Sequence, residues 1–290
     1  VKRWGRSFGC REFFYYFCKQ ISNMKIKEVA EALERFAPLP LQESYDNAGL
    51  QIGLTEVETS GVLLCLDVTE AVIEEAVEKG CNLVVVHHPL LFCGVKQLAD
   101  TTQVERCVRL AIQHNVAIYA AHTNLDNAEG GVNHRIAEHL GLQQVDFLLP
   151  QGECGGVRGG SGIVGYLQKP ESPRSFLERV AQIFGVECLM YNEGPNREIR
   201  KVAVCGGAGE FLIEAAVAQK ADVFLTGEIG YHHFFGWENK IWLGALGHYQ
   251  SEQFTIDLLA QILADECPML RIVKTGVQTN PIKYMWQEEK

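Results

Sequence analysis

Long apolar runs and paired cysteines are both missing from this chain of 290 residues. No apolar run approaches the roughly 18 residues that a membrane-spanning helix needs, so we expect no membrane-embedded segment. The ten cysteines include no Cys-x-x-Cys pair, and two of them, Cys65 and Cys205, lie in apolar strand-like runs. A reduced cysteine behaves there as a small hydrophobic residue. We therefore expect free thiols and a reducing, cytoplasmic environment rather than a disulfide framework.

Positive charge is scarce as well. Lysine and arginine number 26 against 36 aspartates and glutamates, which gives a formal net charge of −10 and a pI of about 5.4. Such a surface disfavours general attraction to nucleic-acid phosphates, so we do not expect a nucleic-acid partner. Hydrophobic content of 47% and charged content of 21% are typical of a globular protein. The length predicts one large domain or two modest ones.

Residues 1–23 differ in composition from the rest of the chain. They are basic and contain a short aromatic cluster, Phe13–Phe17. A signal peptide would need a longer apolar region of about 7–15 residues and a small-residue cleavage site. Helical periodicity starts at Ile26, just after Met24. We expect Met24 to be the true start and residues 1–23 to be a dispensable extension of the gene; a targeting role is the alternative.

The rest of the chain contains an internal repeat. A shift of 140 positions superposes Cys65 on Cys205 and Ile73 on Ile213, within similar apolar runs. Continuous apolar runs predict parallel strands that are buried on both faces. The fold class we expect is therefore α/β, with two related α/β domains that arose by internal duplication. The expected strand–helix–strand units are 61–66, 73–77 and 83–86 in the first half, and 202–205, 213–217 and 223–226 in the second.

The most glycine-rich stretch, Gln151–Gly162, lies between the two halves. It runs into a formal G-x-G-x-x-G at 160–165, but a dinucleotide site needs a helix immediately afterwards. Here a strand-like run and then Pro170 follow, so we expect a flexible crossover loop. Pro173 favours a helix start, and helical periodicity continues to Phe184. The expected boundaries are 24–150 for the first α/β domain, 151–170 for the crossover, and 171–290 for the second α/β domain and its return to the first.

Metal-binding side chains gather just after the predicted strands. Ligand sites of open α/β folds lie at the carboxyl ends of the strands, so we expect a metal site there, between the two domains. Imidazole together with carboxylate suits zinc, manganese, iron, cobalt or nickel, and no thiolates accompany them as in a structural zinc site. The groups are the adjacent pair His87 and His88, the pair His122 and Asp126, and the pair His248 and Glu252; a single glutamate, Glu228, also follows a predicted strand.

The adjacent histidines favour two metal ions. Neighbouring residues of an extended strand point to opposite sides, so His87 and His88 are each expected to serve one ion. The alternative is a buried strand end with satisfied imidazoles. His232 and His233 follow Glu228 closely, and they either approach the site or belong to a loop. The histidines in helix-like stretches, His114, His134 and His139, are not expected to bind metal.

Six motifs, taken together, are typical of one known family. They are Asp46–Gly53, Val86–Leu90, His122–Asp126, Gly130–Asn133, Leu225–Glu228 and Gly247–Glu252. On these motifs the chain, from about Met24 to its C-terminus, resembles the Nif-three-like dinuclear metal-centre proteins, which are also described as GTP cyclohydrolase I type 2 homologues. Many members carry a further domain between the halves, whereas the segment here is short, so this chain resembles the compact form.

The resemblance carries expectations about the site and the assembly. It implies toroidal homohexamers built from dimers, with two divalent metal ions in each chain. It also implies that Glu252 bridges the two ions, and that His122 lies beside them as a proton-transfer or orienting group. The metal ligands that it implies are His87, His88, Asp126, His248 and Glu252.

A metal pair of this kind predicts hydrolysis. Two ions about 3.5–4 Å apart can activate a water molecule and bind a polar substrate oxygen. The expected function is a metal-dependent hydrolase for an unknown small molecule, with a GTP cyclohydrolase-like activity as its most specific form, although the sequence has no P-loop. The alternatives are a non-enzymatic metal-handling or regulatory protein and, from the ring shape, nucleic-acid threading, which the acidic charge disfavours.

Overall fold

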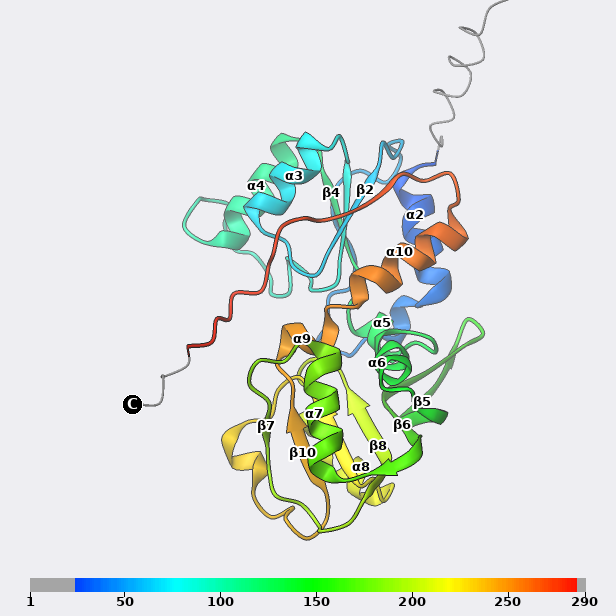
Figure 1. The fold of residues 1–290 in the computed structure, drawn as a ribbon. Coiled ribbons are helices and arrows are strands. Elements are labelled where there is room, and N and C mark those ends of the chain that lie inside the picture. Colours follow the sequence, from blue (N-terminus) through cyan, green and yellow to red (C-terminus); the bar gives the residue numbers. More distant parts are fainter. Residues whose placement is uncertain (1–23, 286–290) are drawn as a thin grey trace, which may run out of the picture.

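The computed structural model describes residues 24–285 as two lobes, each built on its own β-sheet. In Figure 1 the chain forms the upper lobe first, then the lower lobe (green through yellow to orange), and it returns upward through α10 (Thr255–Glu266). Residues 1–23, which we expect to be an extension of the gene, lie outside the described residues. No helix within residues 24–285 has the length and apolar character to cross a membrane.

The first sheet has the strand order β1-β4-β3-β2-β11. β2, β3 and β4 run parallel and every one of their residues is buried, while β11 returns from the end of the chain to pair with β2. Burial on both faces explains why these strands are unbroken apolar runs in the sequence. The strands are β1 Gly49–Ile52, β2 Val62–Cys65, β3 Leu83–Val86, β4 Ala117–Ala120 and β11 Ile272–Lys274.

Helices cover both faces of the first sheet. α3 and α4 pack on one face through residues such as Ile73 and Val108, and α2 and α10 cover the other face. Thr69 and Thr102 begin α3 and α4, since each hydroxyl accepts a hydrogen bond from a first-turn backbone N–H. The elements are α2 Ile26–Phe36, the 3-10 helix η1 Leu39–Leu41, α3 Glu70–Glu78 and α4 Gln103–Gln113.

The second sheet has the strand order β5-β6-β8-β9-β10-β7. β8, β9 and β10 run parallel, β5 and β6 form a long antiparallel hairpin on one side, and the short β7 closes the other edge. The strands are β5 Gln143–Cys154, β6 Val157–Glu171, β7 Met190–Tyr191, β8 Ile199–Cys205, β9 Val223–Thr226 and β10 Trp242–Ala245.

The helices of the second lobe lie on both faces of its sheet and at the junction of the lobes (Figure 1). α7 is the helix predicted from Pro173 to Phe184, and Ser172 caps its start while Gly185 ends it in a left-handed conformation. The elements are α5 Thr123–Asn127, α6 Val132–Leu140, α7 Pro173–Phe184, η2 Glu210–Leu212, α8 Ile213–Ala218, η3 Tyr231–Phe234 and α9 His248–Glu252.

The glycine-rich stretch is not the flexible crossover loop that we expected. It lies in the β5–β6 hairpin, where Cys154 pairs with Val157 around the turn. Its glycines permit close packing: a Cβ at Gly160 would lie 2.7 Å from the ring of Phe147, and one at Gly159 would lie 2.6 Å from Leu41. The composition therefore reflects close approach of a strand to its neighbours, not mobility.

The two sheets contain corresponding parallel units. In the first lobe Val62 pairs with Leu83, and in the second Val202 pairs with Val223. A shift of 140 positions converts one register into the other at all paired positions of these strands. One apolar cluster also includes both sheets, with Leu64 of β2 and Val204 of β8 among its members. The strand ends of the two lobes are thus held in a fixed relation.

Candidate metal centre

The carboxyl ends of the parallel strands meet at a cavity of about 720 Å³ that residues of both lobes line. His87 and His88 follow β3 directly, and His122 and Asp126 lie just after β4. His88, His122, Asp126, His248 and Glu252 line the cavity, whereas His87 is fully buried beside His88. The structure therefore brings all six predicted site residues together.

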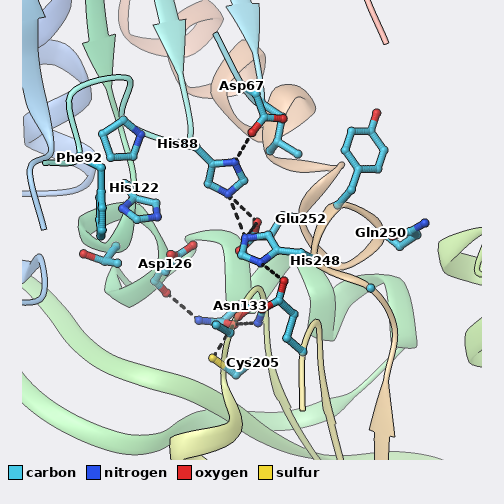
Figure 2. A pocket seen from close by; sticks show the side chains of 18 of the residues that line it. Asp67, His88, Phe92, His122, Asp126, Asn133, Cys205, His248, Gln250 and Glu252 are labelled. Atoms are coloured by element: carbon cyan, nitrogen blue, oxygen red, sulfur yellow. Dashed lines mark hydrogen bonds and ion pairs between the residues drawn. The ribbon is translucent and has the colours of Figure 1, made fainter. Parts of the chain in front are cut away.

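Glu252 occupies the middle of the cluster (Figure 2). Its Oε2 atom lies 2.9 Å from Nε2 of His88 and 3.1 Å from Nε2 of His248, while its Oε1 atom lies 3.8 Å from Nε2 of His87. His87, His88 and Glu252 offer ligand atoms within 4.8 Å of one another, a spacing that could hold a metal ion. The two oxygens of one carboxylate therefore face different imidazoles.

His87 and Asp126 form the buried side of the cluster. Nε2 of His87 lies 3.6 Å from Oδ1 of Asp126, and among the described residues neither atom has a hydrogen-bond partner. Buried polar atoms without partners are rare and destabilising, because their interactions with water are lost without replacement. A cation between these atoms would satisfy both. These two unpartnered atoms therefore show that the residues present fit a metal ion, and this evidence does not depend on the sequence motifs.

The second ring nitrogen of each histidine orients its imidazole. Nδ1 of His87 lies 2.8 Å from the carbonyl oxygen of Ala121, Nδ1 of His88 lies 2.7 Å from Asp67, and Nδ1 of His248 lies 3.0 Å from Glu228. Each Nδ1–H can donate to its acceptor, which directs Nε2 into the cluster. Such outer partners are typical of metal-binding histidines.

The pKa values of the cluster indicate that its environment favours bound positive charge. Burial lowers the pKa of His88, but its bonds to Asp67 and Glu252 outweigh burial and raise that pKa to about 10. Burial likewise opposes the rise of the pKa of His248 to about 9, which the contact with Glu252 causes. Burial raises the pKa of Asp126 to about 7. In the metal-free protein, protons on His88 and His248 thus supply positive charge that a bound cation could supply instead.

His122 lies at the edge of the cluster. Its Nδ1 is 2.7 Å from Oδ1 of Asp46, whose other oxygen accepts a hydrogen bond from the Thr123 backbone N–H at 3.0 Å. Burial acts to raise the pKa of Asp46, but its hydrogen bonds with the His122 ring and the Thr123 hydroxyl prevail and lower that pKa to about 2. The ring centroid of His122 lies 5.4 Å from that of His87. An ionised carboxylate therefore holds this imidazole beside the centre, where it can accept or donate a proton.

Gly207 lets the β8 end approach Glu252 closely. Its φ is +59°, and a Cβ at this position would lie 2.4 Å from Oε1 of Glu252. The neighbouring Gly206 N–H donates to Asn133 Oδ1 at 2.8 Å. The loop therefore requires a residue without a side chain at position 207.

One geometric expectation was wrong. The rings of His87 and His88 do not point apart; their centroids lie 4.8 Å apart and both Nε2 atoms face Glu252. β3 ends at Val86, so the alternation of an extended strand does not continue through the pair. Nδ1 of His233 lies 2.7 Å from Oε2 of Glu210, and neither residue lines the cavity.

The outer carboxylates Asp46, Asp67 and Glu228 were not predicted as orienting groups. Asp67 and Glu228 follow β2 and β9 closely, so the strand-end rule that found the histidines also applies to them. Asp46 lies in a motif quoted above, but its link to His122 spans 76 positions and is visible only in three dimensions. The remaining helical histidines, His114, His134 and His139, do not line the cavity.

Comparison with known proteins identifies relatives across most of the chain. The family description Duf34/NIF3 (NGG1p interacting factor 3) matches residues 24–281. A GTP cyclohydrolase 1 type 2 homolog of Clostridium acetobutylicum is 30% identical over 242 residues, which cover 83% of this chain and 90% of the relative. A protein of the same description from Streptococcus pneumoniae is 31% identical over 273 residues, covering 90% of this chain and 100% of the relative.

Solved structures share the fold. The Staphylococcus aureus protein SA1388 superposes with a TM-score of 0.83 at 27% identity, over 91% of this chain and 100% of its own. A Bacillus cereus protein related to NIF3 superposes with a TM-score of 0.81 at 24% identity, over 91% of this chain and 100% of its own. The two-sheet α/β architecture is therefore that of these proteins.

Proposed function

The chain belongs to the Duf34/NIF3 family, and we propose that it is a dinuclear divalent-metal protein that works as a metal-dependent hydrolase. The observation that carries this proposal is the position of Glu252. Its two oxygens face separate groups of ligand-type atoms, one of which contains the unpartnered Nε2 of His87 and Oδ1 of Asp126. A carboxylate shared in this way suits two cations, because its charge offsets part of their repulsion.

The assignment of ligands follows from those distances. His87, Asp126 and Oε1 of Glu252 would hold one ion. His88, His248 and Oε2 of Glu252 would hold the other. Nitrogen and oxygen donors of this kind suit zinc, manganese or iron.

The chain's own groups support hydrolysis around the metals. When bound, a divalent metal pair supplies an activated water and polarises a substrate oxygen. His122 is held by Asp46 at the cavity edge, so it can take up or deliver a proton at its Nε2 atom. Asp67 and Glu228 keep His88 and His248 in their orientations. These residues therefore divide into metal holders, one proton-transfer group and orienting carboxylates.

The experiment compares metal content with turnover. Protein purified without added metal is analysed for bound ions, and hydrolysis of nucleotides, phosphoesters and cyclic amides is then measured. We expect turnover that is lost on chelation and restored by manganese or zinc. A metal pair that exchanges readily without any turnover would instead favour a metal-handling or regulatory role. The GTP cyclohydrolase description of the relatives names the first substrate to test.

We attribute the two parallel units to an internal duplication. The equality of the β2–β3 and β8–β9 registers after a shift of 140 positions supports this. In this view each copy contributed one set of strand ends, and the metal site formed between them.

We further propose that the protein assembles into a homohexameric ring, because of its family resemblance. Light scattering should give a mass near six times 32.3 kDa, and a stable monomer would remove the ring.

We also place the protein in the cytoplasm. The eight cysteines within the described residues are free thiols, and five of them, including Cys65 and Cys205, are buried. Buried thiols pack as small hydrophobic groups and suit a reducing compartment. Fractionation of cells with an antibody against the chain tests this placement.

A further inference from the structure

Three exposed aromatic rings line the candidate metal cavity. Tyr45 is 63% exposed, Phe92 46% and Phe211 59%, and all three line the cavity. They come from separate segments: the loop before β1, the loop after β3, and η2. The rings of Tyr45 and Phe92 meet edge to face with centroids 6.3 Å apart, and Phe92 meets the His122 ring at 6.0 Å. Figure 2 shows Phe92 beside His122.

We call Tyr45, Phe92 and Phe211 the aromatic rim, and such a rim suits a ligand that contains a flat ring. Large aromatic side chains left in water at the entrance of a cavity expose apolar surface that a ligand can cover. Aromatic faces and edges also bind other π-systems in preferred stacked or edge-on arrangements. Tyr249 and Tyr284 line the same cavity and extend its aromatic wall.

The charge of the cavity opposes an anionic ligand. Within the part of the chain that the structure describes, neither lysine nor arginine lines the cavity. The lining carboxylates are Glu43, Asp67, Asp126, Glu228 and Glu252. Two divalent ions would add four positive charges to these five negative ones, so the lining keeps a net negative charge. Phosphate groups are normally held by arginine or lysine, which this lining does not supply.

On the basis of the proposed function, we propose that the substrate is a flat ring compound that is uncharged or cationic, and that nucleoside triphosphates bind poorly. The aromatic rim selects the ring, and the carboxylate-rich lining rejects additional negative charge. The GTP in the description of the relatives contains a ring that fits this class. Its triphosphate does not fit, because the described lining supplies no lysine or arginine and its five carboxylates exceed the charge of two divalent ions.

Matched nucleosides and nucleoside triphosphates test the charge argument. The metal-loaded full chain is titrated with guanosine, adenosine, cytidine and uridine, and with the triphosphate of each, by calorimetry. We expect at least one nucleoside to bind, and its triphosphate to bind at least about tenfold more weakly, a difference of about 1.4 kcal/mol. Tighter binding of the triphosphates, or no binding by any nucleoside at millimolar concentration, would overturn the proposal.

Variants test the aromatic rim and the charge separately. Phe92→Ala and Phe211→Ala should weaken nucleoside binding about 5- to 100-fold, as expected for loss of base stacking. Phe235→Ala is the matched control, because Phe235 is also 59% exposed but does not line the cavity. Glu43→Gln should improve triphosphate binding relative to nucleoside binding. If neither rim variant changes nucleoside affinity, the rim is not the ring-binding surface.

Metal analysis of the same samples separates the two proposals. If protein with two ions per chain binds triphosphates more tightly than nucleosides, only the proposed substrate class is contradicted. A preparation that cannot be loaded with a metal pair contradicts the proposed function itself. Metal content is measured again after each titration, because triphosphates chelate divalent ions.

Discussion

At the scale of single residues, Gly207 shows how tightly the centre is packed. Gly207→Ala would place a Cβ 2.4 Å from Oε1 of Glu252 in a backbone conformation with φ of +59°. We expect a loss of stability of about 1–2 kcal/mol from the backbone and, in addition, a clear loss of bound metal, measured by denaturant unfolding and elemental analysis.

Gly185→Ala is the control for that substitution. Gly185 has φ of +61°, but its Cβ would meet no atom within 4 Å. It should destabilise the protein without changing metal content. Equal metal loss in both variants would mean that Gly207 acts only through general stability.

The protonation of the histidines predicts a proton count. At pH 7 the metal-free protein carries protons on His88 and His248, whose pKa values are about 10 and 9. Metal must displace them, together with the roughly half proton that Asp126 holds at this pH because its pKa is about 7, so uptake at pH 7 should release between two and three protons. Affinity should rise with pH up to about 9–10 and fall more steeply below pH 7, where Asp126 is also protonated. Calorimetry in buffers of different ionisation enthalpy gives the count, and uptake without proton release would refute these protonation states.

At the scale of elements, the segment after β11 lines the cavity through Asn280, Pro281, Ile282 and Tyr284. In Figure 1 it is the red trace that leaves the upper lobe. Thr279 Oγ1 donates to Oδ2 of Asp67 at 2.8 Å, and Asp67 holds Nδ1 of His88. Thr279→Val should lower metal affinity about threefold to tenfold, less than the about 10- to 100-fold effect of changing a direct outer partner, because Thr279 acts on the ligand only through Asp67.

Thr275→Val provides the comparison within the same segment. Thr275 Oγ1 donates to Glu75 and is not hydrogen-bonded to Asp67. Metal titrations of both variants, followed by competition with a chelator, should show weaker binding only for Thr279→Val. An unchanged affinity in that variant would show that Asp67 holds its position without the segment.

The elements also show which features the sequence could predict. The unbroken apolar runs identified β2, β3 and β9, and the Pro173 start identified α7. Strand ends located the histidines, because the rule depends only on local order. The β5–β6 hairpin was missed because its glycines serve contacts with Phe147 and Leu41, which local composition does not reveal. The pairing of Asp46 with His122 was missed for the same reason: it depends on tertiary structure.

At the scale of the whole molecule, the candidate centre joins the two lobes. His87, His88 and Asp126 follow strands of the first sheet, whereas His248 and Glu252 lie on α9 after the last parallel strand of the second. One apolar cluster contains residues of both sheets and packs the two lobes against each other. Glu252 is the residue through which both sides meet.

The most direct test is therefore the metal content of Glu252→Gln beside His87→Ala and His88→Ala. Glutamine keeps the shape of Glu252 but loses the charge and one acceptor oxygen. Elemental analysis of folded proteins should give two ions in the wild-type chain, reduced occupancy of both in Glu252→Gln, and about one ion in each histidine variant. Glu266→Gln, on an exposed carboxylate that pairs with Arg35, should retain both ions. Two ions in Glu252→Gln, together with the loss of both in a histidine variant, would contradict the bridging carboxylate.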